Sequence, residues 1–378
     1  MKSFLGALAA VSSVLTLGRA QQITTEWTWL GGRDDAVMVR DGLKPTPGFR
    51  RDAMMAVDEQ SDTLFLFGGI LTEFMAPGTP SITNRMSDLW QYSYASGAWR
   101  FVDGTAFNYY SSGSTARPGP CRNGGTFYHR RTRSLYLFGG QVVSENVGDI
   151  VVDQLWRYSF IENRWHFLTG TTDTKLFPVS ATWSYPGSLR LFAHAYDNTT
   201  ETWYVFGGRV TNSLYSNALW KYEVIRGKWT RLNGNAGQNT AGIYSGDQPI
   251  SPGSRHQASL VYDDRRQRIW LFGGYGFGDT AQLPGELNDL WFFELSAGKW
   301  IYLTGSMKAK DAWIASNLQN STELVARAGA AAFCGVQCNE LFIFGGTARV
   351  KASRSMIEGT LYYIITLSDL VQLCSVVE

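Results

Sequence analysis

The chain has few of the residues from which catalytic and metal sites are usually built. Only four of its 378 residues are histidine, and they are widely separated: His129, His166, His194 and His256. No Gly-x-Ser-x-Gly, His-Glu-x-x-His or phosphate-loop pattern is present in the sequence, so hydrolase and nucleotide chemistry have no motif behind them. We therefore predict no bound metal and no cofactor.

Charge is also scarce and balanced. Charged residues make up 17% of the chain, and without Lys2 and Arg19 of the first 20 residues there remain 32 basic and 32 acidic side chains. A neutral chain without blocks of charge gives no electrostatic reason to expect nucleic acid or anionic lipid as a partner. Its 44% hydrophobic and 14% aromatic residues nevertheless predict a folded protein rather than a disordered one.

A mainly apolar run without charged residues lies at the N-terminus. Lys2 precedes an apolar segment from Phe4 to Leu17, and the small residues Gly18 and Ala20 follow. This is the layout of a secretory signal peptide. A run of about 14 residues is short for a membrane anchor, the alternative interpretation. We predict that residues 1–20 are a signal peptide, that residues 21–378 are secreted as an extracellular protein, and that no membrane span remains.

Export predicts oxidised cysteines, of which the chain has four. Four cysteines allow three pairings. Cys334 and Cys338 flank a Gly-Val-Gln turn, so we predict a disulfide between them and leave the pairing of Cys121 and Cys374 open. Two N-glycosylation sequons fit an extracellular surface: Asn198-Thr199-Thr200 and Asn320-Ser321-Thr322.

One sequence unit recurs five times and organises the mature chain. The tripeptide Phe-Gly-Gly closes five apolar runs, and its successive phenylalanines are 71, 68, 66 and 72 residues apart. Because each run is apolar and ends at paired glycines, each is predicted to be a buried strand that leads into a turn. The five phenylalanines are Phe67, Phe138, Phe206, Phe272 and Phe344.

Two further landmarks accompany the tripeptide. The position 19 residues before each phenylalanine, the landmark position, is a glycine after proline in four units and Val325 in the fifth: Gly48, Gly119, Gly187 and Gly253. After the tripeptide, four units carry Leu-Trp with an aromatic two residues on and a second tryptophan nine residues later. Each unit is therefore predicted to hold four strands, with a hairpin of fixed length between the first two.

The fifth unit lacks a final tryptophan strand, and the start of the mature chain holds one. Residues 24–32 contain Trp27, Trp29 and the pair Gly31-Gly32, with no three strands before them. We predict that this segment is the last strand of the C-terminal unit, which closes the five units into a ring and removes an exposed edge. A truncated chain is the alternative.

Paired glycines at a strand end, Asp-Leu-Trp with an aromatic two residues later, and a following tryptophan strand resemble the kelch repeat over about residues 21–378. The resemblance implies an all-β fold, a kelch-type β-propeller of five four-stranded blades in a single domain. Units of 66–72 residues exceed the usual kelch length of about 50. Their extra residues follow each tryptophan strand and resemble the long loops of secreted or surface kelch proteins.

Candidate binding residues form two groups. Arginines recur two or three places after the landmark position, where they would line the central channel and bind an anion such as a carboxylate, or else bond carbonyls and turn acids between blades. Aromatic residues on the long loops are candidates for protein or glycan contacts, unless they pack against their own blades. The recurring arginines are Arg50, Arg51, Arg122, Arg190, Arg255 and Arg327, and the candidate binding residues are Arg51, Arg122, Arg255, Arg327, Tyr109, Tyr110, Tyr244 and Trp313.

The regular repeat and the long aromatic loops predict a secreted kelch-propeller binding scaffold that presents its loops to a protein or carbohydrate ligand. The alternative is a sugar-acting enzyme with a pocket at the channel mouth, which the arginines and family precedent favour. Two titratable side chains and an arginine that converge within hydrogen-bonding reach in the channel would favour the enzyme.

Overall fold

The computed structural model is an all-β fold, and its described residues form no helix. The described residues are 46–48, 50–73, 82–104, 115–144, 148–171, 184–235, 239–247, 249–309, 326–334, 340–351, 362–366 and 370–374. The predicted signal peptide and the predicted closing strand at 24–32 lie outside these ranges, so both stay predictions.

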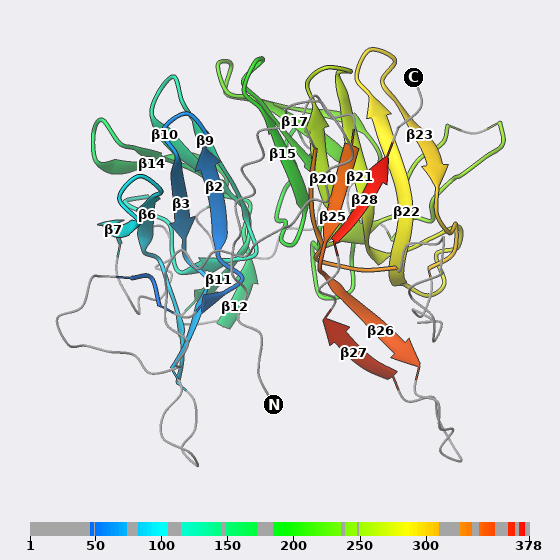
Figure 1. The fold of residues 1–378 in the computed structure, drawn as a ribbon, viewed down its shortest axis with the longest axis horizontal. Helices are drawn as coiled ribbons and strands as arrows, with labels where there is room; N and C mark the ends of the chain where they lie inside the picture. The colour runs from blue at the N-terminus through cyan, green and yellow to red at the C-terminus, as the bar shows by residue number, and fades with distance from the viewer. Residues whose placement is uncertain are drawn as a thin grey trace, which may run out of the picture.

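Four units each form an antiparallel sheet in which the second strand lies between the first and the third, and the fourth pairs with the third (Figure 1). The prediction of four strands is confirmed for these units. Unit one contains β2 (Met54–Asp58), β3 (Thr63–Phe67), β6 (Leu89–Ser93) and β7 (Ala98–Asp103), and unit two contains β9 (Gly125–His129), β10 (Ser134–Phe138), β13 (Leu155–Ser159) and β14 (Arg164–Thr169). Unit three contains β15 (Ala193–Asp197), β16 (Thr202–Phe206), β17 (Leu219–Glu223) and β18 (Lys228–Asn233), and unit four contains β20 (Ser259–Asp263), β21 (Arg268–Gly276), β22 (Gly285–Glu294) and β23 (Lys299–Thr304).

The fifth unit repeats the order of the first three strands. Strand β25 (Glu340–Phe344) lies between β24 (Ala331–Cys334) and β28 (Leu370–Cys374). The five sheets together have the strand order of a β-propeller, as the sequence predicted.

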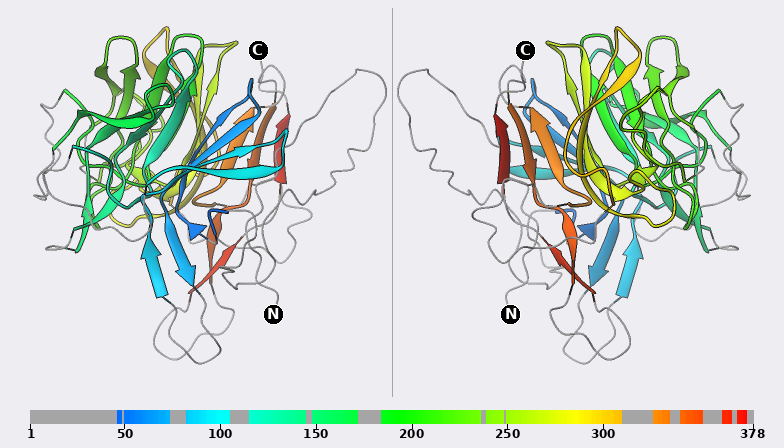
Figure 2. Two further views of the ribbon diagram at one scale, coloured as in Figure 1. Left: turned by 90° about the vertical axis from the view of Figure 1, so that its left-hand side faces the viewer. Right: turned by 90° about the vertical axis from the view of Figure 1, so that its right-hand side faces the viewer.

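Units one and two each have a second, smaller sheet. It lies at the end of the unit where Phe-Gly-Gly ends the second strand. Its strands are only two to four residues long, too short to show in the sequence pattern, and the sequence does not predict them. In units one and two they are β1 (Arg50–Arg51), β4 (Ile70–Glu73) and β5 (Ile82–Arg85), and β8 (Cys121–Arg122), β11 (Gln141–Ser144) and β12 (Gly148–Val151). Unit four adds β19 (Arg255–His256), which pairs with β21, and unit five adds the hairpin of β26 (Thr347–Lys351) and β27 (Tyr362–Thr366), which extends away from the larger sheets (Figures 1 and 2).

Successive units are joined by the same backbone hydrogen bonds. In the first four units, the second glycine of Phe-Gly-Gly donates its N–H to the carbonyl of the residue two places after the next landmark position. The four bonds are Gly69 to Cys121 at 2.8 Å, Gly140 to Leu189 at 2.7 Å, Gly208 to Arg255 at 2.8 Å and Gly274 to Arg327 at 2.9 Å. The first strands β2, β9, β15, β20 and β24 therefore follow one another in chain order.

Aromatic side chains fill the space between neighbouring units. The second tryptophan of one unit packs against the Phe-Gly-Gly phenylalanine of the unit before it, and the ring centroids lie 4.9–5.3 Å apart. The pairs are Trp165 with Phe67, Trp229 with Phe138, and Trp300 with Phe206. Because aromatic side chains bury large apolar areas, these repeated pairs stabilise the contacts between neighbouring units.

Candidate functional site

The recurring arginines occupy two different positions, which we count from the landmark position as +2 and +3. At position +2, Arg255 is completely buried and donates to both carboxylate oxygens of Asp289, at 2.6 and 2.8 Å. Its guanidinium also donates to the carbonyl of Gly273 at 3.1 Å. Arg50 makes the same bonds to Asp88 and Gly68. These arginines hold the Phe-Gly-Gly turn and the Asp-Leu-Trp strand of one unit together.

Arg327, at position +2 of unit five, is also buried and donates to the carbonyl of Gly345 at 3.1 Å. Arg255 and Arg327 were both named as binding candidates. Their burial and their bonds to the blade favour the structural alternative, and we do not include them in the proposed binding surface.

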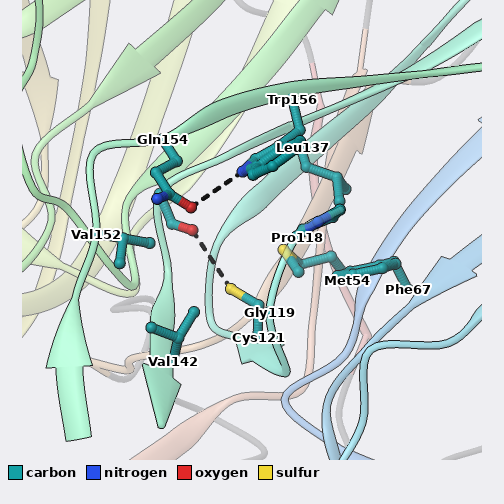
Figure 3. Close-up of a pocket in the computed structure, with 11 residues that line it drawn as sticks. Met54, Phe67, Pro118, Gly119, Cys121, Leu137, Val142, Val152, Gln154 and Trp156 are labelled. Atoms are coloured by element: carbon teal, nitrogen blue, oxygen red, sulfur yellow. Dashed lines mark hydrogen bonds between the residues drawn. The ribbon is translucent and has the colours of Figure 1, made fainter. Parts of the chain in front are cut away.

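Unit two replaces both members of the buried ion pair. Cys121 stands at position +2 and Gln154 at the acidic position, so arginine and carboxylate are lost together. Cys121 Sγ donates to the carbonyl of Gly139 at 3.4 Å, and Gln154 accepts from Trp156 Nε1 at 3.1 Å (Figure 3). A small cavity lies between these side chains. Burial raises the pKa of the free Cys121 thiol to about 12, so it is neither a nucleophile nor a metal ligand at neutral pH.

Position +3 is the second residue of the two-residue strands β1, β8 and β19, and it carries a different set of arginines. The residue there is Arg51, Arg122 or Arg190 in the first three units, and each small sheet or bridge places further side chains beside it. We call the resulting group the arginine belt: Arg51, Arg85, Arg122, Arg190 and Arg209. The two later units have His256 and Ala328 at position +3.

Two carboxylates pair with the belt. Arg122 lies between them, with Nη1 3.4 Å from Asp52 and Nη2 3.4 Å from Asp149. Arg85 donates to Asp149, and Arg51, whose side chain is 64% exposed, lies 3.1 Å from Asp52. Five guanidinium groups therefore face two carboxylates, and the belt keeps an excess of positive charge.

Arg190 is a buried member of the belt, and its two side-chain hydrogen-bond acceptors are uncharged. It is 8% exposed and donates to the neutral amide oxygens of Gln141 and Asn212, at 2.9 and 2.8 Å. Burial, followed by the charges of Arg209 and Arg122, lowers the pKa of Arg190. Among the described residues, the buried Nε atoms of Arg122, Arg190 and Arg209 have no hydrogen-bond acceptor. Because an unpaired buried donor is costly, this arrangement suits an added anion or water.

His256 borders the belt from unit four. Its ring contacts Tyr215 and Tyr275, with centroids 4.8 and 5.4 Å away. Burial, followed by the charge of Arg209, lowers the pKa of His256 from 6.5 to about 3. The imidazole is therefore neutral at physiological pH. It is a polar neighbour of the belt that adds no charge to it.

Acid should destabilise the protein through His256. In the unfolded chain this histidine titrates near 6.5, but in the folded chain only near 3. Between these values the unfolded state binds a proton that the folded state does not, so stability falls as pH is lowered from about 6.5 toward 3. Urea unfolding at pH 7, 5.5 and 4 should show a smaller loss for His256→Gln than for wild type. Parallel losses in the two proteins would contradict this assignment.

The other predicted residues that the structure describes do not belong to the belt. Tyr244 is buried, and its hydroxyl donates to Asp289 at 2.7 Å, so it belongs to the interior of unit four. Burial and the charge of Asp289 raise its pKa. Asn198 is exposed in the turn between β15 and β16, where a glycan has room. The described residues include no group of three or more metal-ligating side chains. Tyr109, Tyr110, Trp313, Asn320 and Cys338 lie outside the described residues, so the Cys334–Cys338 bridge stays a prediction.

The comparisons with known proteins support the fold. No protein-family profile matches the chain. Host cell factor 1, a kelch-repeat protein, is 28% identical over 171 residues in Rattus norvegicus, Homo sapiens and Mus musculus. That match spans 44% of this chain but only 7% of the length of those relatives.

Among solved structures, that of YjhT is similar over 87% of this chain and 83% of its own, with a TM-score of 0.53 and 14% identity. This likeness concerns the fold alone. Together with the kelch-repeat relatives, it supports a kelch-type β-propeller. In the part of the chain that the structure describes, no helix has the length and apolar character that a membrane span requires.

Proposed function

We propose that the chain is a secreted member of the kelch family and works as a protein-interaction scaffold. Its arginine belt holds acidic groups of the partner. The observation that carries this proposal is the excess of five guanidinium groups over two carboxylates, with three buried Nε donors that lack an acceptor among the described residues. An acidic partner would complete those hydrogen bonds with charge-assisted ones, which are the stronger kind.

Secretion, glycans at Asn198 and Asn320, and a ligand that is protein or carbohydrate remain part of the proposal. A protein partner is favoured because a repeat propeller offers a broad, rigid face rather than one deep pocket. The long loops after each tryptophan strand would add contacts around the belt.

The geometry of the belt also fits the second candidate function, that of a sugar-acting enzyme. Arg122 lies 3.4 Å from both Asp52 and Asp149, so two carboxylates and an arginine converge at position +3. Such a pair of carboxylates is the usual equipment for acid and base catalysis on sugars. If the protein is a sugar-acting enzyme, Asp149→Asn should abolish turnover of a sugar while partner capture persists. If it is only a scaffold, neither wild type nor the variant should turn over a sugar.

Partner capture tests the scaffold. Immobilised wild-type protein should retain a partner from the extracellular medium and release it when citrate, a tricarboxylate, is added. Arg122→Ala/Arg209→Ala should retain at least tenfold less, because two of the five cations are removed. Arg226→Ala is the matched control, since Arg226 is an exposed arginine in the β17–β18 turn away from the belt. Equal capture by the belt variant and the control would refute the proposed surface.

A further inference from the structure

A groove lies between units one and two at the opposite end of the sheets from the belt. It opens where the first two strands of each unit turn back in a hairpin, and its cavity volume is about 590 Å³. Binding pockets for small ligands span about 300–1,000 Å³. The groove is therefore large enough to hold a ligand of several rings.

One wall of the groove is aromatic. Phe65 of unit one stacks on Tyr128 of unit two, with ring centroids 4.6 Å apart, and contacts Phe160 at 4.9 Å. Tyr128 and Phe160 are only half-buried and line the groove. Ring surfaces that are anchored in this way offer flat apolar contacts to the faces of sugar rings.

The rest of the groove is cationic and amide-rich. It is lined by Arg100, Arg130 and Arg133, whereas its one acidic side chain, Asp58, is already bound by Arg130 at 2.9 Å. Arg100 uses Nη2 to donate to Gln91 at 2.7 Å. Arg100 and Arg133 are both exposed, and the groove gives neither of them a carboxylate.

A row of side chains runs across unit one toward these cations. Phe65, Gln91 and Arg100 are direct partners on the neighbouring strands β3, β6 and β7, so they point to the same face of the sheet. Neighbouring strands lie about 4.8 Å apart, a spacing similar to the length of one hexose unit. An apolar, an amide and a cationic contact therefore follow one another at the pitch of a sugar chain.

The repeat does not require this charge. Position +14 holds Arg133 in unit two, Glu201 in unit three and Gln267 in unit four, and all three residues have a positive φ near 50°. At the position of Arg100, units three and four have Thr230 and Ile301. Since the same hairpins form without arginine, the two cations are not there to hold the blade.

We propose that this groove binds an acidic oligosaccharide, a sugar chain that carries carboxylates. The sugar rings lie on Tyr128 and Phe160, amides such as Gln91 bond the hydroxyls, and Arg100 and Arg133 pair with the carboxylates. This site is distinct from the arginine belt, and the proposal does not depend on the proposed partner surface.

The test is isothermal titration of the full secreted chain at low salt with the α-1,4-linked trimer of galacturonic acid. Its methyl ester, the same sugar chain without charge, is the matched ligand. Arg100→Thr/Arg133→Gln is the informative variant, because Thr230 and Gln267 already occupy these positions in other units and the fold should persist. Arg226→Ala is the control for loss of an exposed arginine.

Wild type and Arg226→Ala should bind the acidic trimer, and the double variant should bind about tenfold more weakly, as expected for two lost ion pairs. The methyl ester should bind all proteins weakly. Equal affinity for acid and ester, an unaffected double variant with an unchanged melting temperature, or no binding by wild type would overturn the proposal. Tighter binding of hexaglutamate than of the trimer would assign the groove to acidic peptides instead. Partner capture by the belt should be unchanged in the double variant, so failure here is distinguishable from failure of the scaffold.

Discussion

Arg255→Leu is expected to reduce the free energy of unfolding by about 3–5 kcal/mol, because the substitution leaves a buried carboxylate without its cation. Both members of the pair are completely buried, so water cannot take the place of the guanidinium. The carbonyl of Gly273 would lose its donor as well. Chemical denaturation followed by tryptophan fluorescence measures the loss.

A double variant tests whether the loss comes from the unpaired charge, and other units of this chain supply both of its replacement residues. Unit three has Leu189 at position +2, and unit two has Gln154 at the acidic position, so neither unit needs the ion pair. In Arg255→Leu/Asp289→Gln the glutamine still accepts from Trp291 and Tyr244, which now bond to Asp289. We expect the double variant to recover most of the loss, since uncharged side chains can replace a buried ion pair at little cost. A double variant less stable than Arg255→Leu would mean that the arginine acts through something other than charge.

Gly207→Ala should cost about 3 kcal/mol or more by separating units three and four. Gly207 is the first glycine of its Phe-Gly-Gly and has a φ of +68°. A Cβ placed on it would lie 2.5 Å from the carbonyl oxygen of Arg255, which belongs to the next unit. The substitution therefore combines a strained backbone with a collision at the contact between units.

Gly227→Ala separates these two effects. Gly227 has a similar φ of +59°, but the nearest atom to its Cβ would be the Tyr222 hydroxyl at 3.8 Å. This variant should lose only the cost of the left-handed backbone, about 1–2 kcal/mol. Thermal unfolding of both variants gives the difference, which reports the collision alone. Equal losses would show that close approach between units does not require the glycine.

The sequence predicted the larger sheets because their pattern is dominated by burial. Strands such as β3 and β10 are buried along their whole length, and apolar runs that end at paired glycines reveal such strands. The repeated aromatic positions of these strands also form the contacts between neighbouring units, as Trp165 and Phe67 do. These features repeat because every unit solves the same packing problem.

The small sheets could not be predicted because their short strands lack a pattern of buried residues. Strand β1 is only two residues long and β5 is Ile-Thr-Asn-Arg, so neither shows an apolar period. Without those strands, the spacing from the landmark position puts Arg50 and Arg51 in one group. Successive residues of a strand point to opposite faces, and the structure accordingly buries Arg50 and exposes Arg51. Arg85 and Arg209 join the belt only through strand pairing and were missed.

The most direct measurement of this division is thermal unfolding and partner capture of Arg255→Leu and Arg122→Ala, measured side by side. If position +2 holds the blade and position +3 faces the partner, Arg255→Leu will melt many degrees lower than wild type. Arg122→Ala will melt close to wild type but lose capture. An Arg122→Ala protein that melts as low as Arg255→Leu, or that captures the partner as wild type does, would contradict the separation of the two arginine positions.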